Sequence, residues 1–529
     1  YPGPLAQIRT DFLVPQGSSV ISSTLVTKPP RWLVGLSLIT VAIVTIPLAY
    51  VVWRVGEIPW ADIAVVLSRP RVAEITLNTV GLSAAVSATA LMGGVGVAGL
   101  LTRVRFRAAK ALLLISALPL AVPSYLASYG WLVISPGING FLPSWLLLSA
   151  VTVPYVTLPV AAALRGTSAE GEAVARTLGF SPLRAFWLVT WPQVRPAAIA
   201  GALLVFLYTL SDYGLVAMLR YETLTWGIQQ SFAASFDRSQ AAILALLLVV
   251  IALVVVAGER SARGQVAPTT ATVSTLESLR PLSRTLSLAV ILVAPIAGVA
   301  VPLLGLGIRL VGAETVREID VSRLALATGV TVGVAFLAAL VALLLAVPVA
   351  ALAARYSGKW VAGLETLAYL PHAIPGIVIG LSLVFFSLAV LPPLYQTTAV
   401  LVFAYAVLFM PKALGTARAS INAVSPTLVN VARTLGAKPV SAWARVTLPL
   451  ALPGLGIGAL LVAIATMKEL PATLLLRPTG VNTLATELWS RTSAGEFGGA
   501  APYAALLVVV AAIPAMILSG VRSSAKEEL

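Results

Sequence analysis

The sequence Val174-Ala175-Arg176-Thr177-Leu178-Gly179 returns, letter for letter, as Val431-Ala432-Arg433-Thr434-Leu435-Gly436. The offset of 257 residues between the two copies also aligns flanking residues, such as Pro196 with Pro453. The shared register runs over about fifty residues, which is the signature of an internal repeat. We therefore interpret the chain as two copies of one unit.

The composition is that of a membrane protein. Apolar residues make up 59% of the 529 residues, the mean hydropathy is +0.96, and only 10% of the residues are charged. Soluble domains carry about 25% charged residues. We therefore predict an all-α polytopic membrane protein, whose first partner is the lipid bilayer.

Apolar runs near 20 residues, the length that crosses ~30 Å of hydrocarbon, occur six times in each unit. They cover residues 33–53, 75–101, 111–134, 144–164, 197–219 and 241–257, and then 286–308, 325–353, 364–390, 397–411, 454–476 and 501–520. An even number of spans in each unit places both copies of the repeat on the same side of the membrane. The sequence therefore predicts 12 transmembrane helices as two parallel six-helix repeats about a pseudo-twofold axis along the membrane normal.

These spans divide the chain into segments. We expect a cytoplasmic tail (1–32), a transmembrane half 1 (33–257) with a loop at 165–196, a cytoplasmic linker (258–285), a transmembrane half 2 (286–520) with a loop at 412–452, and a cytoplasmic tail (521–529). Residues 13–18 differ by one letter from a common tag-cleavage site. Part of the first tail, within 1–19, is therefore expected to be a tag remnant.

The formal net charge of +15 follows the predicted topology. With a cytoplasmic N-terminus, the inside segments hold 24 basic and 7 acidic residues, whereas the outside loops hold 10 of each. Cytoplasmic loops of membrane proteins are enriched in lysine and arginine. We therefore place both termini in the cytoplasm, and we expect no nucleic-acid partner.

The repeated stretch lies in the two large cytoplasmic loops and predicts a short amphipathic helix that ends at a glycine. Gly179 and Gly436 are placed as the left-handed residues that end such helices, and Ser425 fits the start of the second one. A second short helix is expected to follow, up to Pro192 or Pro449, before the chain re-enters the membrane. A helix of this kind can fill a groove in a partner protein. A duplicated interfacial helix without a partner is the alternative.

The repeated stretch resembles the EAA loop of the permease subunits of binding-protein-dependent ABC importers. That loop reads Glu-Ala-Ala, three residues, Gly, and later an apolar residue, any residue and Pro. Copy one has Ala173-Val174-Ala175 and copy two Asn430-Val431-Ala432 at the start of this pattern, so neither keeps the glutamate in register. Glu172 stands one place early. Both halves also carry Leu-Pro-x-x-x-Pro, at 118–123 and 370–375, and two loops on one chain resemble the fused permeases.

This resemblance implies that each loop forms a coupling helix that docks into an ATPase subunit. It implies three partner chains, namely two ATP-binding subunits on the cytoplasmic face and an extracytoplasmic substrate-binding protein. It also implies that the protein lies in the bacterial cytoplasmic (inner) membrane. The ATPase-coupling residues that it implies are Glu172, Ala173, Ala175, Arg176, Gly179, Pro182, Pro192, Asn430, Ala432, Arg433, Gly436, Pro439 and Pro449.

The chain itself has no nucleotide-binding motif. The phosphate-binding loop G-x-x-x-x-G-K-[ST] does not occur, and the one Gly-Lys pair, Gly358-Lys359, is followed by Trp360. ATP and magnesium are therefore expected on the partner subunits, and this chain is expected to be a transport subunit and not an enzyme. With no cysteine and one histidine, His372, we also expect no metal site.

The substrate is suggested by a resemblance to the ferric-iron importers, carried by residues 467–478, residues 483–489 and Asp212-Tyr213-Gly214. Asp212 and Glu469 are equivalent under the offset of 257. A carboxylate within a span costs ~2.5–3.5 kcal/mol on insertion scales, so it should face the bundle interior or water. We therefore predict a pathway lined by Asp212, Lys468 and Glu469 that favours a cation. Capping of neighbouring helices by the two acids is the alternative.

The sequence thus predicts the permease subunit of an ATP-driven importer. Such a subunit moves its substrate, ferric iron, from an external binding protein to the cytoplasm by alternating access. Two alternatives stay open. The same architecture can import thiamine or a polyamine, and a secondary transporter can use Asp212 and Glu469 to carry ions.

Overall fold

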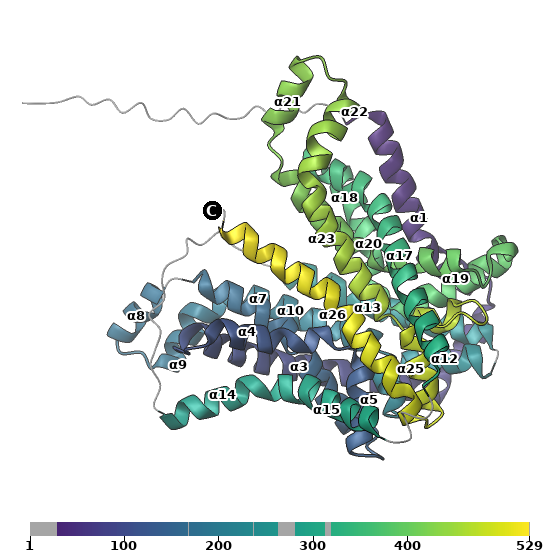
Figure 1. Cartoon of the computed structure of the whole chain (residues 1–529), viewed down its shortest axis with the longest axis horizontal. Helices are drawn as coiled ribbons and strands as arrows, with labels where there is room; N and C mark the ends of the chain where they lie inside the picture. Colours follow the sequence, from purple (N-terminus) through teal and green to yellow (C-terminus); the bar gives the residue numbers. More distant parts are fainter. Residues whose placement is uncertain (1–28, 168, 236, 263–280, 313–318, 528–529) are drawn as a thin grey trace, which may run out of the picture.

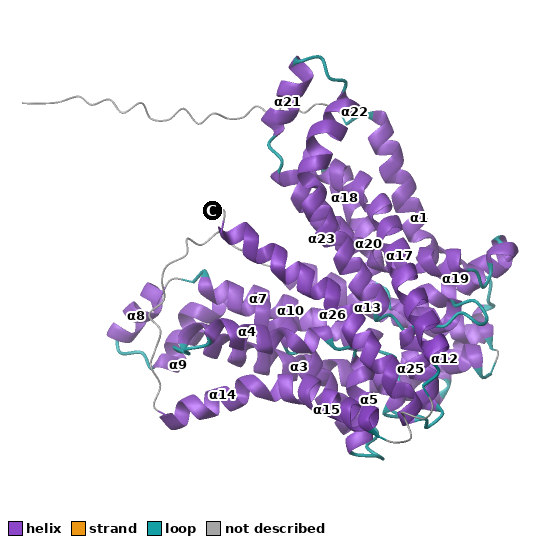
Figure 2. Ribbon diagram, viewed as in Figure 1, coloured by secondary structure: helices purple, strands orange, loops and turns teal. Residues whose placement is uncertain are grey.

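The computed structural model describes residues 29–167, 169–235, 237–262, 281–312 and 319–527. Helices make up the regular structure of these ranges, and no strand occurs in them (Figure 2). The all-α class is therefore confirmed. The tag-like residues 13–18 and most of the predicted linker 258–285 lie outside the described residues.

Ten helices in the described part of the chain are long and apolar enough to cross a membrane. They are Arg31–Gly56, Pro70–Arg103, Phe141–Arg165, Pro182–Ser211 and Arg238–Gly258 in half 1, and Leu282–Val311, Val321–Arg355, Thr398–Ala423, Pro439–Met467 and Phe497–Pro514 in half 2. Two bent helix pairs raise the number to 12 if each pair is one span. The prediction of a polytopic membrane protein is confirmed.

The Leu-Pro-x-x-x-Pro motifs break the third span of each half. In half 1, α4 (Ala109–Ala117) and the 3-10 helix η1 (Leu118–Ala121) meet α5 (Ser124–Ile134) at 91°. The second proline of the motif has no backbone N–H and excludes helical geometry from the residue before it. The straight span expected at 111–134 is therefore two helices at nearly a right angle.

Half 2 repeats this break. There, α18 (Lys359–Tyr369) and η4 (Leu370–Ala373) meet α19 (Gly376–Val390) at 100°. The straight span expected at 364–390 is therefore also two helices. The two breaks lie at corresponding places in the repeat, because each falls on the same proline spacing.

The first helix of half 1 packs on half 2. α1 (Arg31–Gly56) lies against α18, α19 and the long helix α17 (Val321–Arg355) (Figure 1). The Ser382 hydroxyl on α19 donates a hydrogen bond to the carbonyl of Pro47 within α1. The rings of Tyr50 and Phe386 meet edge to face, with centroids 5.5 Å apart. α1 also packs against α13 (Arg238–Ala262) of its own half, but most of its packing is on half 2.

The first helices of half 2 pack on half 1 in return. α14 (Pro281–Pro295) lies against α4 and α6 (Phe141–Thr152), and α15 (Val301–Val311) lies against α5. A Cβ on Gly305 of α15 would overlap the carbonyl of Gly130 on α5, so both glycines are needed for this close crossing. The two halves of the sequence are therefore interlocked in space.

Figure 1 shows two arms of helices that meet at one end and diverge toward the other. The first arm contains α3 (Pro70–Arg103), α7 (Pro154–Arg165) and α10 (Trp191–Ser211), and the second contains α17, α20 (Thr398–Ala423) and α23 (Leu448–Met467). The short helices α8 (Ala169–Thr177) and α21 (Pro426–Thr434) lie at the far ends of the arms. α5, α12 (Leu224–Ala233) and α25 (Leu484–Ser493) lie where the arms meet.

Candidate functional site

Both copies of the repeated stretch form a short helix that ends in the predicted glycine turn. Gly179 follows α8 with a φ of +87°, and Gly436 follows α21 with a φ of +90°. In both copies the glycine N–H donates to the carbonyl three residues back at 3.0 Å, and the next N–H donates five residues back at 3.1 and 3.0 Å. This pair of bonds is the Schellman motif, which requires a left-handed residue. The prediction for the two glycines is confirmed. The hydroxyl of Ser425 also accepts the N–H of Thr427 at 3.3 Å, so the predicted start of α21 is confirmed.

The two helices present exposed apolar side chains. Leu178 is 72% exposed and Leu435 is 83% exposed, and Val174 and Val431 are exposed on the same helices. These helices stand at the ends of the two arms (Figure 1). Large apolar side chains exposed together in such a place indicate a surface that a partner protein covers.

The second helix of each loop runs directly into the next span. One helix extends from Pro182 to Ser211 and another from Pro439 to Met467. The first contains a π-helical turn, η2 (Phe186–Thr190), and the second has the same turn at the equivalent place. The prediction that the second helix ends at Pro192 and Pro449 is therefore wrong, because both prolines lie within a helix. A π-helical turn directly before each proline accommodates its missing N–H.

Glu172 on α8 is held inside its own half. Arg103, the last residue of α3, donates from Nη1 to the two carboxylate oxygens at 2.9 and 2.7 Å. The hydroxyl of Thr190 donates to the same carboxylate. Val429 stands at the equivalent position of half 2, so this contact has no counterpart there. The carboxylate thus attaches α8 to its arm.

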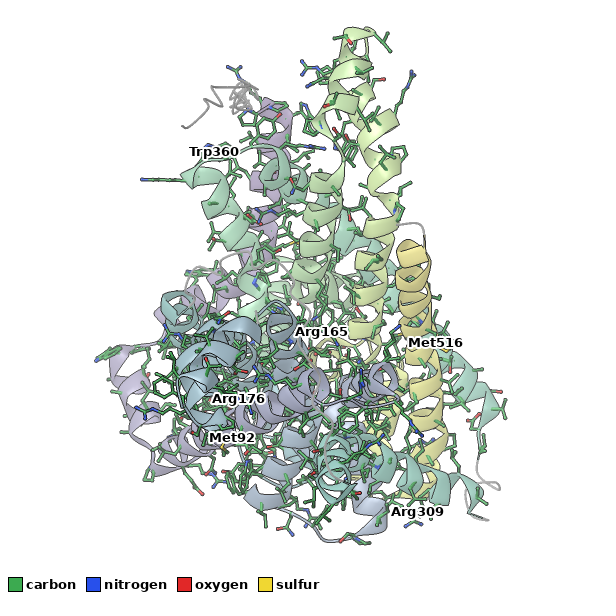
Figure 3. The ribbon with its side chains drawn as sticks, turned by 90° about the vertical axis from the view of Figure 1, so that its left-hand side faces the viewer. Met92, Arg165, Arg176, Arg309, Trp360 and Met516 are labelled. Carbon is green, nitrogen blue, oxygen red and sulfur yellow. The ribbon has the colours of Figure 1, made fainter. Side chains whose placement is uncertain are left out.

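The other residues predicted to couple to an ATPase lie on α8, on α21 and in the segments that follow each of them. Ala175 is buried and Ala432 is half-buried, and the exposed residues are Ala173, Arg176, Gly179, Pro182, Pro192, Asn430, Arg433, Gly436, Pro439 and Pro449. Figure 3, which looks onto the end of the first arm, shows Arg165 and Arg176 there and Trp360 on the other arm.

Asp212 satisfies the first turn of the short helix α11 (Gly214–Met218). Its Oδ1 accepts the N–H of Leu215 at 3.0 Å and that of Val216 at 3.4 Å. The hydroxyl of Ser124, the first residue of α5, donates to Oδ2. The side chain is buried, so these partners replace the water that an exposed carboxylate would bind.

Glu469 has the same place and role in half 2, where it satisfies the first turn of α24 (Pro471–Leu476). Its Oε1 accepts the N–H of Ala472 at 2.9 Å, and its Oε2 accepts the N–H of Thr473 at 3.0 Å and the hydroxyl of Thr473 at 2.8 Å. A Cβ on Gly376, the first residue of α19, would lie 2.8 Å from Oε1. Both acids therefore make the helix-capping contacts that we named as the alternative, and their contact with substrate stays a prediction.

Lys468 reaches from half 2 to the break in half 1. Its Nζ donates to the carbonyls of Leu120 at 3.2 Å and Ala121 at 3.3 Å, at the end of η1. The hydroxyl of Tyr125 donates back to the Lys468 carbonyl at 3.4 Å. We call Asp212, Lys468, Glu469 and these two carbonyls the central junction. The structure thus brings together all three residues that the sequence assigned to the pathway.

Two further basic residues near the central junction were not assigned from the sequence. Lys412 lies on α20, which packs against η4, where His372 lies, and against α24, which begins three residues after Lys468. Its Nζ lies 5.8 Å from the centre of the Phe409 ring. We had counted Lys412 with the cytoplasmic loop because the apolar run ends at residue 411, whereas α20 continues to Ala423. Within the described ranges, these three basic side chains form no ion pair with a carboxylate.

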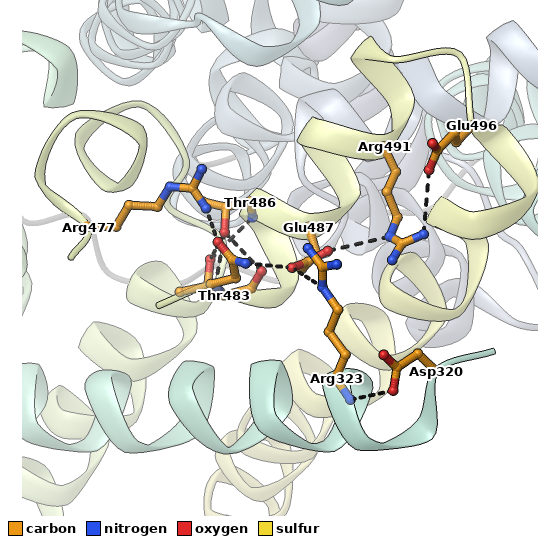
Figure 4. Close-up of polar contacts among 9 residues, drawn as sticks. Asp320, Arg323, Arg477, Thr483, Thr486, Glu487, Arg491 and Glu496 are labelled. Atoms are coloured by element: carbon orange, nitrogen blue, oxygen red, sulfur yellow. Dashed lines mark hydrogen bonds and ion pairs between the residues drawn. The ribbon is translucent and has the colours of Figure 1, made fainter. Parts of the chain in front are cut away.

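A polar cluster around Glu487 lies where the arms meet (Figure 4). The Glu487 side chain is 2% exposed and accepts from Nε of Arg323 at 2.9 Å, Nε of Arg491 at 3.4 Å and the amide of Asn482 at 2.7 Å. Arg477 donates to Asn482, and burial lowers the pKa of the Arg477 guanidinium. A buried carboxylate is tolerated only when donors surround it. The cluster therefore fixes α25 to the start of α17. Asn482 and Arg491 lie within five residues of Glu487, but Arg323 lies 164 residues away, so the attachment of α25 to α17 could not be predicted from local spacing.

Metal ligands do not gather anywhere in the described residues. No group of three or more His, Cys, Asp or Glu side chains is placed there so that it could hold a metal ion.

The chain is similar to transport permeases over most of its length. The family described as "Binding-protein-dependent transport system inner membrane component" matches twice, at residues 90–259 and 346–522. The Fe(3+)-transport system permease protein FbpB 2 of Haemophilus influenzae is 34% identical over 500 residues, which cover 93% of this chain and 98% of that protein.

Two other relatives match about half of the chain or less. The molybdenum transport system permease protein ModB of Mycobacterium tuberculosis is 28% identical over 253 residues, 44% of this chain and 94% of that protein. The sulfate transport system permease protein CysT of Escherichia coli is 29% identical over 225 residues, 39% of this chain and 80% of that protein.

Proposed function

Because the chain belongs to the binding-protein-dependent transport system inner membrane components, we propose that it is the fused permease subunit of an ATP-driven ferric-iron importer. It is a multi-pass membrane protein, and the family matches it twice. The observation that carries the ATP-driven mechanism is the pair of coupling helices. α8 and α21 repeat one sequence and one glycine turn, and both expose apolar side chains at the ends of the arms.

In the mechanism that we propose, two ATPase subunits bind α8 and α21 and draw them together when they close on ATP and magnesium. The arms then turn about a pseudo-twofold axis along the membrane normal, and the pathway opens outward to a docked substrate-binding protein. After hydrolysis the arms separate and the pathway opens inward. The interlocked packing of α1 and of α14 with α15 supports this mechanism, since it keeps the halves together while the arms move. Both termini lie in the cytoplasm in this arrangement.

Iron as the substrate is supported by the extent of the sequence similarity to one relative. The iron(III) permease matches nearly the whole of both chains, including both repeats, whereas the molybdenum and sulfate permeases match about one half. We expect ATP-dependent uptake of radiolabelled iron(III) in proteoliposomes that contain the chain, its ATPase subunits and its binding protein. Omission of any one of these components should abolish uptake. If the complex takes up thiamine or a polyamine and not iron, that solute replaces iron as the proposed substrate. Uptake by the chain alone along an ion gradient would favour a secondary transporter.

An oxyanion importer is the second candidate, and the basic side chains near the central junction favour it. Lys412 and Lys468 lie on neighbouring elements, and neither forms an ion pair with a carboxylate in the described part of the chain. Both acids of the junction are meanwhile occupied by backbone N–H groups. The two lysine charges would favour a substrate that passes as an anion. The pathway that favours a cation stays a prediction, and under the oxyanion candidate iron would move as an anionic complex.

Replacing Lys412 with methionine tests this candidate. Methionine keeps much of the side-chain length and removes the charge, so we expect a several-fold rise in KM for a substrate that passes as an anion. The measurement is ATP-driven uptake of molybdate, sulfate and iron(III) by the reconstituted complex. Lys359→Met, at an exposed lysine of α18, is the matched control and should leave KM unchanged. An unchanged KM for all three solutes in Lys412→Met would remove the oxyanion candidate.

A further inference from the structure

The long second helix of each half ends in an arginine. α3 ends at Arg103 and α17 ends at Arg355, 252 residues further on. The same offset relates Thr79 to Thr331, whose hydroxyls accept the N–H of Leu224 at 2.8 Å and of Leu484 at 2.9 Å. The two arginines are therefore equivalent positions of the repeat, and each lies at the coupling end of its arm.

In half 1, Arg103 connects three elements. Its Nη1 contacts both carboxylate oxygens of Glu172 on α8, its Nη2 donates to Thr190 in η2 at 3.1 Å, and its guanidinium lies 5.8 Å from the Phe186 ring. The side chains of Arg103 and Glu172 are 36% and 19% exposed, so water screens this ion pair only partly.

This ion pair is a polar attachment of α8 to its arm. Among the residues of α8 whose side chains are described, only Ala175 is buried. Gly171 lies so close to η2 that a Cβ there would be 2.9 Å from Cγ1 of Val189. α8 therefore touches the arm along a thin strip, and the guanidinium fixes its position on that strip.

In half 2, Arg355 holds the base of the coupling helix. Its Nη2 donates to the carbonyls of Ile421 at 2.9 Å and Val424 at 2.8 Å, at the end of α20. These carbonyls lie at the C-terminus of α20, where that of Ile421 also accepts the N–H of Val424 at 3.3 Å, and a cation next to them is favourable. The next residue, Ser425, begins the turn into α21. Arg355 thus fixes the point from which α21 projects.

We propose that Arg103 and Arg355 are positioning residues that attach the two coupling helices to their arms. This proposal rests on the proposed importer function. A coupling helix transmits a push only if its attachment is stiffer than the arm that it moves. Arg103 provides this stiffness through a side-chain ion pair, and Arg355 provides it through the backbone. Arginine suits the place of Arg103 because its planar fork reaches Glu172 and Thr190 at once, whereas lysine has a single ammonium.

The test compares Arg103→Ala with wild type in proteoliposomes that contain the ATPase subunits and the binding protein. We expect the ATPase subunits to stay bound and to hydrolyse ATP, while the substrate moved per ATP falls about tenfold, since charged hydrogen bonds are lost. Arg355→Ala should behave in the same way. Arg107→Ala, an exposed arginine four residues after Arg103, is the matched control and should keep the wild-type ratio.

A reversible link between α3 and α8 separates positioning from folding. Because the chain has no cysteine, Arg103→Cys combined with Glu172→Cys introduces its only two thiols. Joining them with a bis-methanethiosulfonate reagent should restore the substrate moved per ATP, and a reductant should remove the effect. A purely structural role predicts lower yield and lower thermal stability with an unchanged ratio in Arg103→Ala, and that result would overturn the proposal. If the wild-type chain neither binds an ATPase nor transports substrate, the proposed importer function is wrong. That result is distinct from a failure of the proposal about the two arginines, which appears only in the variants.

Discussion

Replacing Gly179 and Gly436 together with valine is expected to abolish ATP-driven uptake while the partner ATPase keeps its activity. Both glycines have a left-handed backbone, with φ of +87° and +90°. A β-branched residue avoids this conformation, and holding it there costs on the order of 1–3 kcal/mol per site. We expect the chain to relieve this strain by giving up the Schellman turn. The ends of α8 and α21 then change direction on the arms.

The cause of this effect is backbone conformation and not bulk. A Cβ built on either glycine meets nothing within 4 Å. A larger side chain therefore has room at both positions, and the strain comes from the left-handed φ alone. Asparagine tolerates a left-handed backbone, so Gly179→Asn with Gly436→Asn should retain most of the uptake. Gly363→Val is the control, at a helical glycine of α18 that also has open space around it.

The measurement is substrate uptake per ATP hydrolysed, together with co-purification of the ATPase subunits. The valine pair should lose coupling, and the asparagine pair and Gly363→Val should keep it. If the valine pair transports as well as the asparagine pair, the glycine turns do not set the direction of the coupling helices.

Glu469→Gln is expected to lower uptake at least about tenfold, whereas Asp212→Asn should be tolerated. Both oxygens of Glu469 accept backbone N–H groups, from Ala472 and Thr473. A glutamine amide must therefore turn its NH2 group toward one of these donors, and a buried unpaired donor costs about 1–3 kcal/mol. In Asp212 one oxygen accepts both N–H groups and the other faces the hydroxyl of Ser124, which can accept from an asparagine NH2.

The responses expected of Glu469→Gln and Asp212→Asn distinguish two roles for the acids, namely helix capping and contact with the substrate. If the acids cap helices, Glu469→Gln should lose thermal stability as well as uptake, and Asp212→Asn should lose little of either. If the acids line the pathway for a cation, both variants should lose affinity for the substrate at unchanged stability. Thermal unfolding of the purified variants and the KM for uptake together decide between the two. If both variants lose affinity for the substrate equally and keep their thermal stability, the two acids line the pathway.

The coupling helices were predictable because their signals are local. A repeated six-residue match gave their positions, and the glycine that ends each copy gave the left-handed turn. Ser425 could be read as the start of α21 for the same reason. The family pattern, however, did not give the role of Glu172. Its partners Arg103 and Thr190 lie 69 and 18 residues away in the sequence.

The third spans show where local signals were insufficient. The proline spacing was visible in both halves, but prolines are common in membrane helices, so a bend of 91° or 100° did not follow from it. Lys412 was misplaced for a related reason. An apolar run ends where the surroundings become polar, whereas α20 continues to Ala423 because its hydrogen bonds lie within the helix.

The sequence by itself determined the membrane class, the duplicated unit, the coupling helices with their glycine turns, and the membership of a transport family. These features depend on composition and on short-range backbone chemistry. Each is determined by residues that lie close together in the sequence. The tertiary structure decided that α1 covers half 2 and that α14 and α15 cover half 1. It also decided that Lys468 caps the break of the opposite half and that Arg103 holds Glu172. Each of these is a contact between segments far apart in the chain, and such contacts are selected by packing and by the need to satisfy buried polar groups.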